Sequence, residues 1–314
     1  MLEENGDISV LESGTNPSVK QKLAFAEACL RKQVSREISA IVFDQVGIAQ
    51  VQNLLPSIFR LPYAVFVYGV DVWHPLNAFE RRALLNATGV LCISHFTYQK
   101  ALAVNAWFPK AVVVPLCLPP DYKPSELRNV SFRPVALTVG RLDETYKGHD
   151  EILNIWPEVL KYVPDAVYWV VGTGKYLPRL QLKVRTLGIE DSVKFWGFVS
   201  DETLADLYAQ CAVFAMPSYG EGFGLVYLEA MRHRKPCIGS IHDAAKEVIV
   251  HNQTGFLVDQ SNPAELLQML LKLLQHPEIC ARLGEMGYQR ERQVFSYQHF
   301  RKRVKEALMP LWKS

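Results

Sequence analysis

The chain has 314 residues, which is enough for two α/β domains of ordinary size. Hydrophobic residues make up 49% and charged residues 21%, as in globular proteins, and a net charge of +2 gives no electrostatic case for nucleic-acid binding. No apolar run approaches the roughly 18 residues that a membrane-spanning helix needs.

The cysteines and the N-terminus favour an intracellular protein. The 6 cysteines are scattered without a Cys-x-x-Cys pair, so we expect no disulfide framework and no zinc site. The first residues, MLEENGDISVLESG, lack the basic and then apolar pattern of a signal peptide. We therefore expect the protein to be cytoplasmic.

In the first part of the chain, apolar runs alternate with helical patterns. The runs expected as strands are 39–44, 63–69, 89–94 and 111–116. The segments 79–88 and 95–104 have helical spacing, and Ser94 is placed to cap the second of them. The apolar runs are continuous rather than alternating, which is typical of strands covered on both faces of a parallel sheet.

A second series of the same kind follows a break at about 117–133, where prolines and polar residues show no periodicity. Its expected strands are 135–142, 166–174, 193–199, 212–218, 235–240 and 255–259. Its expected helices are about 149–162, 176–187, 201–210, 224–233 and 243–251, followed by two closing helical runs, 264–275 and 277–308.

This alternation predicts two doubly wound α/β units joined by a linker. We place the first domain at 1–118 and the second at 119–296. Ligands of such sheets bind outside the carboxyl ends of the strands, so the loops at those ends are the candidates for chemistry.

The loop GRLDETYKGHD, after the first strand of the second series, carries two cations, Arg141 and Lys147. Gly140 and Gly148 flank them and allow close backbone approach. An arginine fork beside a lysine point charge suits a diphosphate. Solvated loop cations are the alternative, and the residues by themselves leave both open.

Two further strand ends have a structural and a functional interpretation. VVGTGKY, which includes Thr173, lacks the third glycine of a dinucleotide fingerprint and the acidic residue about twenty positions later, so we favour a tight turn over an NAD site. In FVSD, Ser200 and Asp201 can cap the next helix. Alternatively, the backbone at Phe198 and Val199 meets the edge of a nucleobase.

The stretch YGEGFGLVYLEA, residues 219–230, holds Glu221 in a glycine-rich turn and Glu229 in an apolar helix. The start of that helix favours anions. A buried charge needs a partner, so an exposed position on the helix surface is a sufficient explanation for Glu229 when it is considered by itself. Three glycines in five residues around a glutamate are hard to explain by packing, so we interpret the turn as a ligand-binding loop.

Glu221 and Glu229 with GFG between them, GRLDETYKG before them and GFLVD after them resemble the retaining glycosyltransferases of family four, over about 38–300. The resemblance implies the GT-B fold, in which two Rossmann-like domains face a cleft. It also implies a hexosyltransferase that moves sugar from a UDP- or GDP-sugar to a saccharide or lipid-linked acceptor, in polysaccharide or glycoconjugate biosynthesis.

The resemblance assigns roles on the donor side. Arg141 and Lys147 would bind the diphosphate and neutralise the leaving group, Glu221 would contact the transferred sugar, and Glu229 would bind the ribose. The other expected donor contacts are Gly140, Thr173, Phe198, Val199, Asp201, Gly222, Phe223, Gly224 and Leu225. No divalent metal or other cofactor is expected, because the cations and the helix end take over its electrostatic role.

The sequence departs from the family pattern in three places. Tyr68 stands where histidine is common, so Tyr68, Gly69 and Asp71 are left to position a sugar hydroxyl on the acceptor side. IHDAAKEVI lacks the Gly-Gly usual before Glu247, which weakens a backbone contact to phosphate. The usual first strand and its glycine-rich loop are missing from 1–37, so we expect an incomplete N-terminal domain.

That gap keeps a second hypothesis open, in which the chain is a nucleotide-sugar-binding partner subunit without catalysis of its own. The resemblance also implies that the C-terminal helix, 297–314, packs on the N-terminal domain. This helix carries a basic cluster, Arg301, Lys302, Arg303 and Lys305. We favour a solvated basic face over contact with the cytoplasmic face of a membrane.

Overall fold

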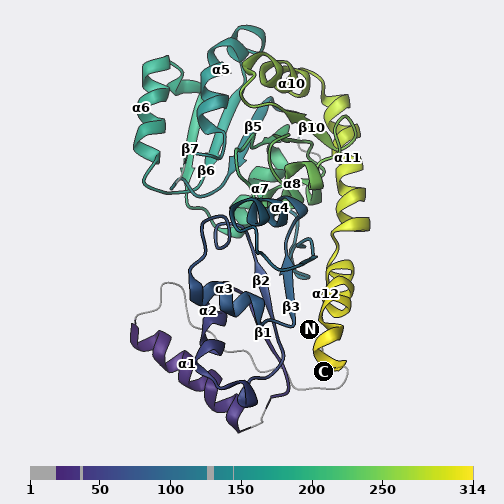
Figure 1. Cartoon of the computed structure of the whole chain (residues 1–314). Coiled ribbons are helices and arrows are strands. Elements are labelled where there is room, and N and C mark those ends of the chain that lie inside the picture. The colour runs from purple at the N-terminus through teal and green to yellow at the C-terminus, as the bar shows by residue number, and fades with distance from the viewer. Residues whose placement is uncertain (1–18, 36–37, 126–130, 144, 314) are drawn as a thin grey trace. The chain divides into compact units, whose positions relative to one another are not determined.

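A computed structural model of the chain describes residues 19–35, 38–125, 131–143 and 145–313 (Figure 1). The N-terminal stretch 1–18, Glu144 of the cationic loop and 126–130 of the expected linker lie outside the described residues. The chain separates into two compact units, Met1–Pro115 with Phe300–Ser314 and Leu116–His299. The domain limits drawn from the sequence stay a prediction.

The first unit is built on a parallel sheet of order β1-β2-β3-β4. Its strands are Ile41–Phe43 (β1), Tyr63–Val67 (β2), Gly89–Cys92 (β3) and Val112–Val113 (β4). They lie inside the four apolar runs predicted as strands, and each is shorter than its run. All residues of β2 are buried, because it is an inner strand with side chains packed on both faces.

The residues of β2 alternate between two clusters on opposite faces of this sheet. Tyr63, Val65 and Val67 pack with residues of α1 (Val19–Val34), α2 (Val46–Ala49), α3 (Ala78–Leu85) and α4 (His95–Val104). Ala64 and Phe66 pack with residues of α12 (Tyr297–Lys313). The sequence had placed no helix at 19–34, at 46–49 or in the short 3-10 turns Gln50–Leu54 and Ser57–Phe59.

The predicted cap of α4 is confirmed. The Ser94 hydroxyl accepts a hydrogen bond from the Thr97 backbone N–H at 2.9 Å. Such a bond satisfies one of the N–H groups that the first turn of a helix leaves without a partner.

The second unit contains a parallel six-stranded sheet of order β10-β9-β8-β5-β6-β7. The strands are Val135–Val139 (β5), Val167–Val171 (β6), Val193–Gly197 (β7), Val213–Ala215 (β8), Cys237–Ser240 (β9) and Gly255–Val258 (β10). The chain runs outward from β5 to β7, returns to β8 beside β5, and then runs outward to β10. This is the doubly wound order predicted from the sequence, with its switch point between β5 and β8.

Helices cover both faces of the six-stranded sheet (Figure 1). The cluster on one face combines strand residues with α5 (His149–Tyr162), α6 (Leu177–Leu187) and α10 (Pro263–Gln275). On the other face, Phe214 of β8 packs against Tyr208 of α7 (Asp201–Gln210) and Tyr227 of α8 (Leu225–Arg232). These helices match the segments predicted from the sequence to within one residue at each end.

Two helix predictions were wrong. The run 277–308 is not one helix, because α11 (Pro277–Val294) ends before Phe295, which leaves the helical conformation. The Phe295 side chain is buried, and its ring packs edge-on against the Phe223 ring with the ring centroids 5.8 Å apart. The segment 243–251 contains only one helical turn, α9 (Ala245–Val248). Its next residue, Ile249, is extended and buried, so core packing overrides the helical pattern in both places.

Candidate active site

Two loops meet at the carboxyl ends of β5 and β8, the switch point of the second sheet. The loop after β5 runs to Lys147 and Gly148, and the loop after β8 runs from Pro217 to Glu221. The Tyr219 backbone N–H donates to the Tyr146 carbonyl at 2.8 Å and ties the loops together.

Gly148 makes this approach possible. It has φ +84, and a Cβ atom there would lie 2.4 Å from the Pro217 carbonyl oxygen. Only glycine accommodates both the left-handed backbone and the close neighbour. The sequence analysis predicted close approach of a ligand at this glycine, and the structure shows close approach of the β8 loop.

Lys147 and Glu221 form an ion pair across the two loops. The Lys147 Nζ lies 2.5 Å from Glu221 Oε2, and the two side chains are 13% and 16% exposed. Burial by itself would lower the pKa of Lys147, but the adjacent Glu221 carboxylate outweighs burial and raises that pKa. The structure therefore joins two residues that the sequence places 74 positions apart.

The Glu221 backbone is held from a third loop, which follows β9. Its N–H donates to Asp243 Oδ2 at 3.0 Å, and its carbonyl accepts from the Ala244 N–H at 3.1 Å. Burial raises the pKa of Asp243 to about 6, although the hydroxyl and N–H donors around the carboxylate oppose that rise. The sequence analysis missed Asp243, although it had marked the surrounding IHDAAKEVI as unusual.

The turn around Glu221 has a packing reason that the sequence did not reveal. Gly224 has φ +86, and a Cβ atom there would lie 2.4 Å from the Tyr227 ring and 3.2 Å from Glu221 Cγ. Phe223 is 1% exposed, so it is buried in the turn. Gly222 is half-buried and Leu225 is partly exposed at the start of α8. The expectation that packing would not explain the glycines is wrong for Gly224.

Glu229 has a partner within the core of the second unit. Its Oε2 accepts a hydrogen bond from the Tyr208 hydroxyl at 2.7 Å. Burial raises the pKa of Glu229, the Tyr208 hydrogen bond opposes this rise, and nearby Asp201 adds to it. Sequence reasoning missed Tyr208, because it fits the apolar pattern of α7 like any core aromatic residue.

The remaining residues expected on the donor side lie at the ends of the neighbouring strands. Arg141 is exposed on the same loop as Lys147. A Cβ atom built on Gly140 would lie 3.4 Å from the Lys147 side chain. The Thr173 side chain is exposed, and its carbonyl accepts from the Leu142 N–H at 2.9 Å. The turn 172–174 thus packs on the loop after β5, as the structural interpretation of GTG predicted.

The segment after β7 presents an exposed aromatic residue. Phe198 is 86% exposed and Val199 is half-buried. Ser200, rather than Asp201, caps α7, because its hydroxyl accepts from the Thr203 N–H. The Asp201 side chain is exposed in the first turn.

The residues expected on the acceptor side lie in a loop of the first unit, after β2. Asp71 Oδ1 accepts from the backbone N–H groups of Tyr68 and Gly69, at 3.0 and 2.8 Å, and so closes the loop. Burial, with Asp44 and Asp71 nearby, raises the pKa of Tyr68 to about 12, so its hydroxyl stays protonated at neutral pH. Gly69 has φ +127, and a Cβ atom there would lie 2.8 Å from the Trp73 ring.

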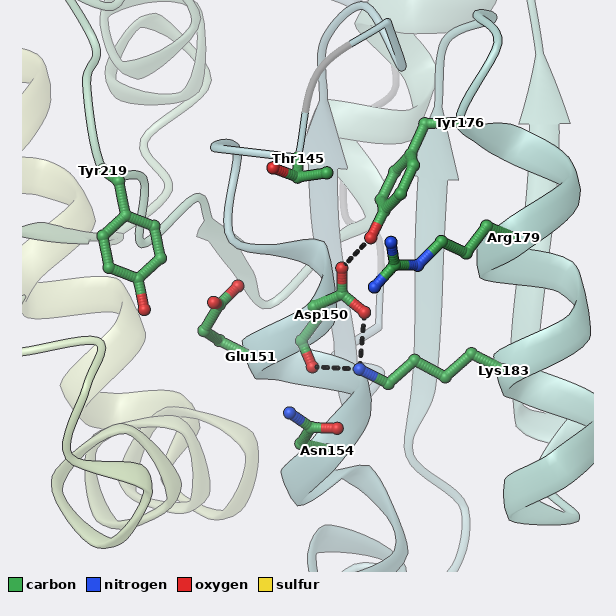
Figure 2. A pocket seen from close by; sticks show the side chains of 8 residues that line it. All are labelled: Thr145, Asp150, Glu151, Asn154, Tyr176, Arg179, Lys183 and Tyr219. Carbon is green, nitrogen blue, oxygen red and sulfur yellow. Dashed lines mark hydrogen bonds and ion pairs between the residues drawn. The ribbon is translucent and has the colours of Figure 1, made fainter.

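A polar pocket between α5 and α6 contains none of the predicted site residues. Figure 2 shows Asp150 between Tyr176, whose hydroxyl donates to it, and Lys183, whose Nζ lies 2.5 Å from it. Burial opposes ionisation of Asp150, but the Lys183 and Tyr176 hydrogen bonds outweigh it and lower the pKa of this carboxyl. These contacts tie α5 to α6 and explain the pocket as a structural feature.

Two features are absent from the described parts of the chain. Among those residues, no group of three or more histidine, cysteine, aspartate or glutamate side chains is placed to hold a metal ion. No helix in the ranges that the structure describes has the length and apolar character to cross a membrane.

The model of the family Glycosyl transferases group 1 matches residues 123–290, more than half of the chain. The chain belongs to this family. The match covers the loops after β5, β8 and β9, and it confirms the family predicted from their motifs. The matched residues lie within the second unit, Leu116–His299.

Curated glycosyltransferases are similar to about half of the chain. A glycosyltransferase of Haemophilus influenzae is 31% identical over 176 residues, 56% of this chain and 48% of that protein. A GDP-mannose-dependent alpha-(1-6)-phosphatidylinositol monomannoside mannosyltransferase of Mycolicibacterium smegmatis is 33% identical over 162 residues, 49% of this chain and 42% of that protein. The chain thus spans less than half the length of these relatives.

Solved structures of glycosyltransferases share the fold over nearly the whole chain. HepE of Anabaena, solved with UDP and glucose, superposes with a TM-score of 0.77 and 22% identity, covering 93% of this chain and 83% of that one. Sucrose-phosphate synthase of Thermosynechococcus elongatus superposes with a TM-score of 0.79 and 21% identity, covering 96% of this chain and 82% of that one. The α/β fold with two parallel sheets, of the GT-B type, is thereby confirmed.

Proposed function

We propose that the protein is a retaining, metal-independent glycosyltransferase that moves a hexose from a UDP- or GDP-sugar to a saccharide or lipid-linked acceptor. The observation that carries the proposal is the mostly buried Lys147–Glu221 ion pair at the switch point of the second sheet. Ligands of doubly wound sheets bind at this place. A fixed cation and a fixed carboxylate side by side suit a substrate that carries phosphate beside sugar hydroxyls.

In this proposal the donor lies across the strand ends of the second unit. Lys147 and Arg141 bind the diphosphate and stabilise the charge that develops on it as the bond to the sugar breaks. Glu221 accepts hydrogen bonds from hydroxyls of the transferred sugar, and Glu229 accepts from the ribose. The backbone of Gly222, Phe223, Gly224 and Leu225 approaches sugar and phosphate.

The other contacts are proposed from the same arrangement. The exposed Phe198 side chain, with Val199 and Asp201, contacts the nucleobase in this proposal, and the 86% exposure of Phe198 supports such a contact. Gly140 and Thr173 border the diphosphate. On the acceptor side, the protonated Tyr68 hydroxyl and the Asp71 loop hold a sugar hydroxyl.

The names of the relatives support the class of donor. The Mycolicibacterium smegmatis relative is GDP-mannose-dependent, and HepE was solved with UDP and glucose. The two differ in base and sugar, so a thermal-shift screen over UDP- and GDP-sugars is the direct way to identify the donor. Binding to the native state raises the melting temperature by an amount that grows with ligand concentration over Kd.

The name of one relative supports the proposed class of acceptor. The phosphatidylinositol acceptor named for the Mycolicibacterium smegmatis relative supports a lipid-linked substrate. Such a substrate would bring the chain to a membrane surface, and Arg301, Lys302 and Lys305 are exposed cations on α12. Sedimentation with anionic and neutral vesicles distinguishes this contact from a solvated basic face.

The test of the proposal is sugar transfer by Lys147→Ala and Glu221→Ala, with the donor identified by the screen and with EDTA present. Loss of either group should lower kcat by about 100-fold or more, because a fixed charge at the developing charge of the transition state is removed. Wild-type turnover should survive EDTA. Lys183→Ala, which breaks an ion pair of the same length in the same unit, should keep wild-type turnover.

Full turnover in Lys147→Ala or Glu221→Ala would overturn the proposal. Binding of a nucleotide-sugar by the wild type, with no transfer to any acceptor tested, would favour the partner subunit without catalysis of its own. Calorimetry with UDP and GDP on the same preparation separates the two.

A further inference from the structure

Asp243 is a buried carboxylate in the loop between β9 and α9. It is 0% exposed. It forms no salt bridge among the described residues, whereas Glu221, from whose backbone N–H it accepts a hydrogen bond, pairs with Lys147. A buried carboxylate persists in a fold only where several donors satisfy it.

Three hydrogen-bond donors to Asp243 come from two segments of the site. Oδ2 accepts from the Ser218 hydroxyl at 2.5 Å and from the Glu221 backbone N–H at 3.0 Å. Oδ1 accepts from the Ala245 N–H at 2.9 Å. One carboxylate thus connects the loop after β8 with the start of α9.

The same loop also holds the other side of the Glu221 residue. The Ala244 N–H donates to the Glu221 carbonyl at 3.1 Å. Both backbone groups of Glu221 are therefore fixed by consecutive residues, Asp243 and Ala244. The Glu221 side chain, which extends from this fixed backbone, reaches Lys147 at 2.5 Å.

We propose that Asp243 is a positioning residue for Glu221: it fixes the backbone of Glu221, and thereby holds the Glu221 carboxylate beside Lys147 where the transferred sugar is bound. The inference rests on the proposed function, since it assigns Glu221 to the sugar. It gives IHDAAKEVI a role in place of the Gly-Gly phosphate contact that the segment lacks. The carboxylate of this segment serves the donor site through the loop after β8.

Asp243→Asn is the informative change because it keeps the size of the side chain. An amide has one acceptor oxygen and one donor NH₂ group. With its NH₂ group at the Oδ2 position, the amide faces the Glu221 N–H and loses that hydrogen bond directly. With its NH₂ group at the Oδ1 position, it faces the Ala245 N–H and loosens the loop whose Ala244 N–H holds the Glu221 carbonyl. Displacement of a catalytic group by about 1 Å can cost about 100-fold in rate, so kcat for transfer should fall toward that extent.

A kinetic test separates positioning from general loss of stability. In Asp243→Asn, kcat should fall while the Kd for UDP or GDP stays near the wild-type value, because Arg141, Lys147 and Glu229 remain. Adding Asp243→Asn to Glu221→Gln should cause no further loss, since the first residue acts only through the second. Wild-type kcat in Asp243→Asn, or a further loss of similar size in the double variant, would overturn the inference.

Glu291→Gln provides a matched control. Glu291 is also a carboxylate that is 0% exposed, and it bonds Arg232 of α8 rather than either loop of the site. Its substitution should lower the melting temperature and leave kcat at the wild-type level. An equal fall of kcat in both variants would show that lost stability, and not positioning, explains the result.

A second measurement needs neither donor nor turnover. The rate at which acetic anhydride labels Lys147, followed by mass spectrometry of its peptide, reports how firmly the ammonium is paired, because only the neutral amine reacts. Glu221→Gln should raise this rate several-fold, and Asp243→Asn should raise it likewise by releasing Glu221. An unchanged labelling rate in Asp243→Asn would refute the positioning role, whether or not the wild type transfers sugar. Absence of sugar transfer by the wild type would refute the proposed function instead.

Discussion

At the scale of single residues, the site depends on carboxylates that differ in their partners. Glu221 pairs with Lys147, Glu229 accepts from the Tyr208 hydroxyl, and Asp243 accepts only from neutral donors. Burial costs most free energy for an ionised carboxylate that has no cation as a partner. Asp243, which is 0% exposed and has no cation as a partner among the described residues, should therefore show a marked effect of pH on the stability of the fold.

Burial raises the pKa of Asp243 from 3.8 to about 6. Because the folded protein holds this proton more tightly than the unfolded chain, the contribution to stability is full below about pH 4 and is lost as pH rises through about 6. We expect the free energy of unfolding of the wild type, relative to Asp243→Asn, to fall by up to about 3 kcal/mol between pH 4 and pH 7.

Urea unfolding of both proteins at several pH values measures this difference. Groups elsewhere, such as Glu151 and Glu229, titrate equally in the two proteins, so the comparison isolates Asp243. A difference that stays constant across the range would contradict the raised pKa.

At the scale of elements, the turn between β8 and α8 is set by backbone geometry as much as by its ligand. Gly224 is the residue before α8 and has φ +86, and Tyr227 one turn later occupies the space that a Cβ atom would need. The Tyr227 hydroxyl donates to the Met216 carbonyl at 2.6 Å, so its ring cannot easily move away. The turn and the helix therefore hold each other in place.

Gly224→Ala should destabilise the protein by more than the 1–3 kcal/mol or so typical of left-handed strain, and should lower transfer, because the displaced turn carries Glu221. Gly188→Ala is the matched control. Gly188 also has a left-handed backbone, φ +64, but a Cβ atom there would meet nothing within 4 Å. Thermal unfolding of both variants makes the comparison, and equal losses of stability would contradict a role for Tyr227.

At the scale of the whole molecule, two parallel sheets form two compact units, and the family match lies in the second. The doubly wound order brings the loops after β5 and β8 to one place, although β6 and β7 separate them in the chain. A donor that binds there contacts loops from several strands at once.

Hydrogen exchange in the presence of saturating UDP or GDP should show where the nucleotide binds. We expect added protection to centre on 145–147 and 217–229, the segments that contain Lys147 and Glu221 of the ion pair. Amides of α10, 263–275, should change little and serve as an internal reference. Protection centred on α10, or on the pocket between α5 and α6, would contradict the proposed donor site.

The sequence by itself determined the strands, most helices and the motifs. Continuous apolar runs such as Tyr63–Val67 are sufficient to predict buried parallel strands, and Ser94 reveals its cap, because both depend on neighbours in the chain. The end of α11 at Phe295 could not be predicted, since it depends on burial against the distant Phe223.

Only the tertiary structure decided which polar groups meet. Lys147 and Glu221 are 74 positions apart, and Glu221 and Asp243 are 22 apart. Sequence spacing carries no signal for such contacts, because the order of strands in a sheet determines which loops become neighbours. The motif around Glu221 and Glu229 predicted a donor site through its resemblance to a glycosyltransferase family, whereas the buried carboxylate that holds Glu221 in place emerged only from the fold.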